Sequence, residues 1–134
     1  MQTITVATSG KGLYEITDQV RAYVRQGGSL QGVCTVFIRH TSASLTIQEN
    51  ADLDVRRDLQ AWIERLVPER DALYTHTVEG PDDMPAHIKA ALTATTLSIP
   101  FVDRELLLGT WQGIYVWEHR TRAHQRQIVL HTTS

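Results

Sequence analysis

Alternating apolar and polar residues predict most of the strands in this chain. Gln2 to Ala7 alternates in this way, and Leu13 to Ile16 is expected to pair with it after the turn at residues 10–12. The β-branched and aromatic stretch from Gly32 to His40 predicts a central strand, with Cys34 and His40 on the same face. Further strands are expected at residues 44–48, 96–102, 106–110, 113–120 and 126–131.

Apolar residues at helical spacing predict three helices. Thr17 is expected to cap a short helix that runs through about Gln26 and is stopped by Gly27 and Gly28. The clearest helix is expected over Leu53 to Leu66, with Asp52 or Asn50 as its cap. The third is expected over Met84 to Leu92, capped by Asp82 or Asp83. Three helices among strands joined by short turns favour an α+β fold, one domain over residues 1–134, with mostly antiparallel sheets.

Composition limits the classes of function that this chain can have but does not identify one. A formal net charge of −2 and a pI of about 6.3 give no overall positive field for nucleic acid or a membrane surface. The single cysteine, Cys34, excludes an internal disulfide and is expected to be a small buried hydrophobe. Neither a signal peptide nor a membrane span is expected, so the predicted location is the cytoplasm.

Polar residues that break the apolar pattern are the candidates for chemistry. His40, Thr41 and Ser42 follow the central strand, where hydroxyls and backbone amides can bind an anion such as phosphate. The alternative is a Ser/Thr turn that satisfies its own backbone. Arg120, Arg122 and Arg126 form a local basic run, which is read first as solvated surface.

Histidines near the third helix are candidates for a metal or proton-transfer site. Asp83 and His87 are four residues apart and share a helix face, and His76 precedes them by seven residues and eleven residues respectively. Imidazoles in such positions can bind a divalent metal or carry protons, although the spacing matches no compact metal motif. Lys89 lies on the other side of the helix from His87. The alternative to a functional site is that these are ordinary surface histidines.

Two further features lie toward the C-terminus. Glycines bracket residues 109–113, which is typical of backbone that passes close to a ligand or a neighbouring chain. Glu118 shares a strand face with Ile114 and is either a site carboxylate or an ion-pair partner of Arg120. The remaining histidines lack comparable context and are expected at the surface: His119, His124 and His131.

Three long motifs, at residues 40–46, 79–89 and 108–115, resemble the YjbQ family, which is named for a secondary thiamine-phosphate synthase activity. The resemblance covers nearly the whole chain. It implies a small α+β unit that forms a homotrimer. It also implies a shared polar set: His40, Thr41, Ser42, Asn50, His76, Asp83, His87, Lys89, Thr110, Gln112 and Glu118.

The leading hypothesis is a small-molecule enzyme, with thiamine-phosphate synthesis as a weak side activity, that acts on a phosphorylated or heteroaromatic metabolite. Its acid/base groups are expected among His40, His76, His87 and Glu118. Lys89, Arg120 and nearby hydroxyls would offer few positive charges to a leaving pyrophosphate. The second hypothesis is a metal-dependent hydrolase in which His40, His76 and His87 bind Zn²⁺ and Glu118 or Asp83 activates water. The expected cofactor is accordingly a divalent metal, Zn²⁺ or Mg²⁺. The third is a trimer that binds an anion or metabolite without catalysis.

Overall fold

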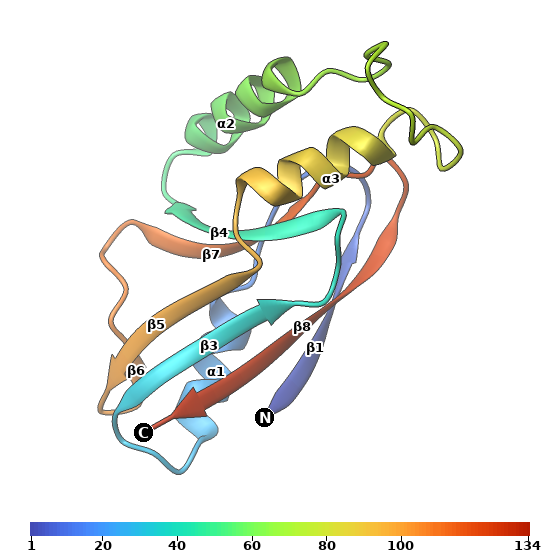
Figure 1. Ribbon diagram of the computed structural model, residues 1–134. Helices are drawn as coiled ribbons and strands as arrows, with labels where there is room; N and C mark the ends of the chain where they lie inside the picture. Colours follow the sequence, from blue (N-terminus) through green and yellow to red (C-terminus); the bar gives the residue numbers. More distant parts are fainter.

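The computed structural model describes residues 1–134 and confirms the α+β class, with three helices and two antiparallel sheets (Figure 1). Strands run in the order β1-β8-β3-β5-β6 in the five-stranded sheet and β2-β7-β4 in the three-stranded sheet. The elements are β1 (Gln2–Thr8), β2 (Gly12–Glu15), α1 (Thr17–Gln26), β3 (Gly32–Ile38), β4 (Ala43–Glu49), α2 (Leu53–Leu66), α3 (Asp83–Leu92), β5 (Thr96–Val102), β6 (Glu105–Leu106), β7 (Gln112–Glu118) and β8 (His124–Thr133).

The hydrophobic core lies where α1 meets the two sheets. Val20 and Val24 of α1 join Val36 of β3, Leu45 of β4 and Ile128 of β8 in one cluster of 14 buried residues. Figure 1 shows α1 behind β3 and β8, on the face of the large sheet away from the viewer. Burial of these side chains supplies the main driving force for joining the sheets.

The predicted central strand is confirmed, because β3 lies between β8 and β5. Cys34, Val36 and Ile38 alternate into the core and are at most 1% exposed. Burial raises the pKa of the Cys34 thiol to about 11, so this side chain packs as a hydrophobe, as expected. His40 lies just beyond the end of the strand and is partly buried.

The predicted pairing of the first two strands is wrong. β1 pairs with β8, whereas β2 pairs with β7, with Gly12 opposite Glu118 and Glu15 opposite Tyr115. Gly10 and Gly12 have φ angles of 136° and 150°, which glycine adopts readily. The turn at residues 9–11 therefore carries the chain from one sheet to the other instead of folding it back as a hairpin.

Two smaller predictions also need correction. Thr17 is the first residue of α1 and not its cap; its hydroxyl accepts from the Ile114 amide at 2.9 Å and donates to Glu15 at 2.7 Å. The bond ties α1 to β7. The strand expected over residues 106–110 is reduced to β6, the two residues Glu105–Leu106.

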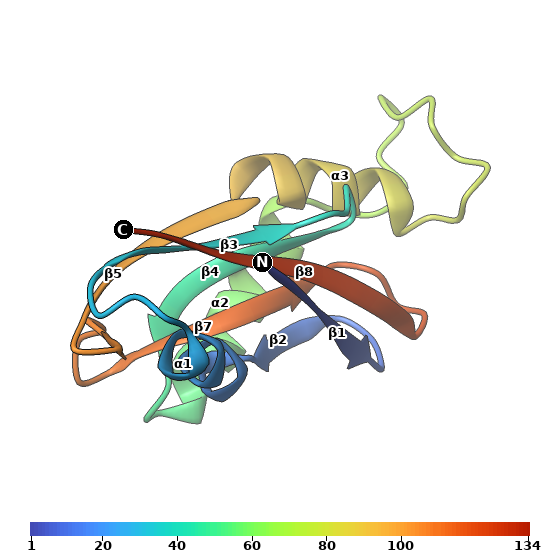
Figure 2. The same ribbon diagram turned by 90° about the horizontal axis from the view of Figure 1, so that it is seen from below.

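The other two helices lie beside the small sheet. α2 spans the predicted residues, and Asp52 caps it by accepting from the Asp54 amide at 2.9 Å. Ile63 is its one buried residue, while Trp62 and Leu66 are 48% and 52% exposed. α3 packs against β4, and Figure 2 shows the loop before it extending away from the sheets. No helix is long and apolar enough to cross a membrane.

Candidate functional site

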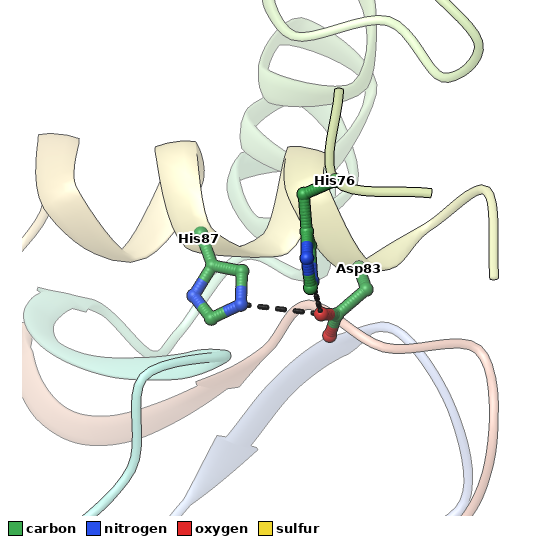
Figure 3. Close-up of side chains that lie close together, drawn as sticks. All are labelled: His76, Asp83 and His87. Atoms are coloured by element: carbon green, nitrogen blue, oxygen red, sulfur yellow. Dashed lines mark hydrogen bonds and ion pairs between the residues drawn. The ribbon is translucent and has the colours of Figure 1, made fainter. Parts of the chain in front are cut away.

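The first turn of α3 and the loop before it bring together two imidazoles and a carboxylate. Nε2 of His76 lies 2.6 Å from Oδ2 of Asp83, and Nε2 of His87 lies 3.2 Å from the same oxygen (Figure 3). Asp83 and His87 share a helix face because they are four residues apart. All three ligating atoms lie within 4.8 Å of one another, and we call these residues the His-Asp cluster.

The His-Asp cluster is open on its histidine side and fixed on its carboxylate side. The His76 and His87 side chains are 40% and 36% exposed, whereas Asp83 is 7% exposed. Arg120 donates from Nη1 to Oδ1 of Asp83 at 2.6 Å and from Nε to Asp82 at 2.9 Å. Arg120 therefore orients Asp83 so that Oδ2 faces both imidazoles.

The charge state of Asp83 follows from these neighbours. Burial alone raises its pKa, but the hydrogen bond from His76 and the charge of Arg120 outweigh burial and hold the pKa below its usual range. Asp83 is consequently ionised at neutral pH. An ionised carboxylate beside two imidazoles is a donor set that suits a divalent metal.

Hollows adjoin the His-Asp cluster on both sides. One, of about 340 Å³, is lined by His76 together with Tyr74 and Met84. Another, of about 270 Å³, is lined by His87 together with His40 and Thr41. A small molecule therefore has room on either side of the cluster.

His40 lies near the cluster but is not part of it. Its Nε2 accepts a hydrogen bond from the Gln127 amide at 2.8 Å, which uses the lone pair of that nitrogen. Burial, and then the charge of Arg126, lower the pKa of His40. In this single chain the set that geometry brings together is thus His76, Asp83 and His87, without His40.

Glu118 is buried behind the loop that carries His40. It accepts from Arg126 at 2.7 and 2.5 Å, from the Thr8 hydroxyl at 2.6 Å and from the Arg120 amide at 3.1 Å. The side-chain partner expected for it, Arg120, turns instead to Asp82 and Asp83. Arg126 also donates to the Ser42 hydroxyl at 3.0 Å, so the Glu118–Arg126 pair supports the strand-end loop from below.

Lys89 does not reach the His-Asp cluster. Its side chain is 1% exposed, and its ammonium forms an ion pair with Glu64 of α2. Glu64 also accepts from Lys11 at 3.0 Å, so a chain of charges joins α3, α2 and the turn before β2. In this chain Lys89 holds two helices together.

Asn50, Thr110 and Gln112 lie far from the histidines. In the pairing of β4 with β7, Ala43 lies opposite Glu118 and Glu49 lies opposite Gln112. Ser42 precedes the first residue of β4, and Asn50 follows its last residue, so the two lie at opposite ends of the strand. Seven-residue strands separate these ends by roughly 20 Å. Asn50 donates to Glu15 at 3.2 Å, and the Gln112 side chain accepts from the Gly109 amide at 2.7 Å. Within one chain Asn50 and Gln112 form hydrogen bonds at the far end of the small sheet.

Sequence reasoning missed two buried residues near the site. His119 was expected at the surface, but it is 0% exposed, and its Nε2 lies 2.8 Å from the Ser44 hydroxyl. Arg126 is only 3% exposed, contrary to the prediction of a solvated side chain. The signal for Arg126 was present, because alternation places it on the same face as Ile128 and Leu130, which are both core residues.

Comparisons with known proteins identify the family. The profile described as "UPF0047 protein YjbQ-like" matches residues 2–134. A Synechocystis UPF0047 protein is 52% identical over 98% of this chain and 90% of its own length, and YjbQ of Salmonella typhimurium is 39% identical over 96% and 93%. A crystal structure of a YjbQ/UPF0047 protein from Clostridium acetobutylicum superposes with a TM-score of 0.91 at 35% identity, covering 99% of this chain and all of that one. The motifs, the fold and these matches agree, and the chain belongs to the YjbQ-like UPF0047 family.

Proposed function

We propose that this chain is a metal-dependent enzyme that acts on a small phosphorylated metabolite, with His76, Asp83 and His87 as the metal ligands. One observation carries the proposal: two imidazole nitrogens and a carboxylate oxygen lie within 4.8 Å of one another. Three protein ligands with one open position are typical of catalytic zinc sites. The hollows beside His76 and His87 give a substrate access to that position.

The ligand chemistry favours Zn²⁺ over Mg²⁺. Imidazole nitrogen suits zinc and neighbouring transition metals, whereas Mg²⁺ prefers oxygen ligands and keeps several of its waters. A bound ion would replace the two hydrogen bonds that His76 and His87 make to Asp83. The carboxylate would keep its bond to Arg120, which serves as the orienting partner that metal ligands usually have.

Hydrolysis is the reaction class that this site supports best. A divalent ion held by His76, Asp83 and His87 would lower the pKa of a water molecule and polarise the bond that this water cleaves. The residues of the chain hold the substrate beside it: Tyr74 and Met84 line the hollow next to His76 and suit an apolar or heteroaromatic group.

Thiamine-phosphate synthesis remains a proposal for a side activity. The two cations expected to hold leaving pyrophosphate are both engaged elsewhere. Lys89 is buried in its pair with Glu64, and Arg120 is bonded to Asp82, Asp83 and the Glu79 carbonyl. This arrangement supports a hydrolase more than a dedicated synthase.

We also propose a homotrimer located in the cytoplasm. Trp111 is 60% exposed, and Trp62 and Leu66 are about half exposed, so large apolar side chains remain uncovered in one chain. Aromatic residues of this kind are enriched in interface cores. Tyr115 and Trp117 are buried within the chain and do not add to this exposed surface. Light scattering that reports a monomer at micromolar concentration would contradict the trimer.

Elemental analysis of protein purified without an affinity tag tests the metal site. We expect close to one equivalent of zinc per chain, lost in His76→Ala and His87→Ala and retained in His131→Ala, which removes an exposed histidine. Zinc-loaded wild type should hydrolyse members of a panel of small phosphorylated compounds, and the two site variants should not. Wild type that retains no zinc after dialysis against it would refute the proposal. Zinc binding without turnover would favour the non-catalytic trimer.

A further inference from the structure

A continuous groove leads away from His87 along the end of β3. The hollow of about 270 Å³ at His87 and a larger one of about 450 Å³ share three lining residues, His40, Thr41 and Thr95. The larger hollow extends to Phe37 and Arg39. We call the two together the strand-end groove.

The strand-end groove holds unused hydrogen-bond donors. Arg39 is exposed and forms no ion pair, whereas Arg25, Arg57 and others on the surface are paired with carboxylates. The hydroxyls of Thr41 and Thr95 form no hydrogen bond within the chain. Ser42 accepts from Arg126 and keeps its own hydroxyl proton free to donate.

The groove also differs in charge from the other hollows. No aspartate or glutamate lines it, whereas Asp71 lines the hollow at His76 and Glu79 and Asp82 line a third one. Arg126 is buried directly beneath Ser42 and adds positive charge from below, although Glu118 offsets part of it. A free guanidinium with several hydroxyl donors and no opposing carboxylate suits a dianion better than a neutral ligand.

We infer that the strand-end groove is the subsite for the phosphate group of the substrate, with Arg39 as its specificity-determining residue and Thr41, Ser42 and Thr95 as hydroxyl donors. This assignment deepens the proposed function and rests on it for the reaction. It does not rest on the metal for binding. Because His87 lines one end of the groove, a small phosphomonoester held by Arg39 extends its remaining atoms toward the His-Asp cluster.

Binding of inorganic phosphate to metal-free protein tests the subsite apart from the metal site. Chelator-treated wild type is titrated with phosphate by calorimetry, beside Arg39→Gln, Thr41→Val and Arg65→Gln. Arg65 is the matched control, because it is exposed and unpaired on α2, away from the groove. We expect Arg39→Gln to weaken binding about tenfold or more, since charge-assisted bonds are the strong ones. Thr41→Val should weaken it less, and Arg65→Gln should bind as wild type.

The other outcomes overturn the assignment. Wild type that does not bind phosphate, or Arg39→Gln and Arg65→Gln that change affinity equally, would remove the subsite while leaving the zinc analysis untouched. Acetate that competes as well as phosphate would reassign the groove to carboxylates. Glycerol phosphate is expected to bind at least as tightly as phosphate. Retention on phosphatidic acid vesicles instead would point to a lipid headgroup and contradict a small-molecule site. Circular dichroism on each variant checks that it is folded.

Discussion

Arg120 donates a hydrogen bond to Oδ1 of Asp83 at 2.6 Å, whereas the two histidines, His76 and His87, contact Oδ2 of the same carboxylate. The same guanidinium bonds Asp82 and the Glu79 carbonyl, so it also ties the loop before α3 to the segment after β7. One side chain thus fixes both the carboxylate and the loop that carries His76. The geometry of the cluster depends on a residue that does not belong to it.

Arg120→Gln should therefore weaken zinc binding without removing a ligand. Loss of a partner that orients a metal ligand typically lowers affinity about 10–100-fold. A competition titration against a zinc-binding dye measures the change. Arg122→Gln is the control, because Arg122 is an exposed neighbour without an ion pair. Equal affinity in Arg120→Gln and wild type would show that Asp83 is oriented by other contacts.

Glu118→Gln should lower stability and spare the metal site. The substitution leaves the Arg126 charge buried without its counterion, a change that typically costs about 3–5 kcal/mol. Glu105→Gln removes an ion pair to Arg25 in which both side chains are about half exposed, and should lower the free energy of unfolding far less, because exposed ion pairs are screened by water. Urea unfolding compares the two. A Glu118→Gln protein with unchanged stability but no ligand binding would instead give this residue a direct role at the site.

Local patterns predicted the elements whose signals lie within a few residues. The limits of α2 follow from its apolar spacing and the Asp52 cap, and the limits of β5 follow from its alternation. The i, i+4 spacing likewise placed Asp83 and His87 together. Strand partners were not predictable in this way, because β2 pairs with β7 instead of β1, and its partner residues lie 100 or more positions away along the chain.

The candidate site was predictable only in part for the same reason. His76 lies beside Asp83 because of an irregular loop whose path depends on Arg120. No periodic pattern in the sequence predicts the path of such a loop. Asn50 and Gln112 break the apolar pattern as clearly as His40 does. Asn50 and Gln112 nevertheless lie at the opposite end of the small sheet from His40. Only the pairing register of β4 and β7 shows that they do not belong to the same site.

Gly32→Ala should destabilise the protein, while Gly28→Ala should not. A Cβ at Gly32 would lie 2.2 Å from the backbone oxygen of Thr133, so β3 and β8 would have to separate locally. Steric overlap of this kind typically costs about 1–3 kcal/mol. A Cβ at Gly28 would meet no atom within 4 Å. Thermal unfolding of both variants provides the measurement, and equal melting temperatures would mean that the strand end adapts freely.

His119 makes stability depend on pH. It is fully buried, its Nδ1 has no hydrogen-bond partner, and burial together with the nearby Lys89 charge lowers its pKa to about 3. In the unfolded chain a histidine has a pKa of about 6.5. Between these two values the unfolded state binds a proton that the folded state does not. Stability is therefore fully present above about pH 6.5 and falls as pH is lowered toward 3.

The contribution of His119 is isolated by comparing the stability of wild type and His119→Gln at several pH values. Gln keeps a polar group near the Ser44 hydroxyl but does not titrate. From pH 7.5 to pH 5, wild type should lose about 2 kcal/mol more than the variant, because each unit below the unfolded pKa corresponds to about 1.4 kcal/mol. His131→Gln, at an exposed position, should retain the wild-type slope. Parallel curves for wild type and His119→Gln would mean that His119 can be protonated in the folded protein, and that the buried pocket around Ser44 and Lys89 admits water.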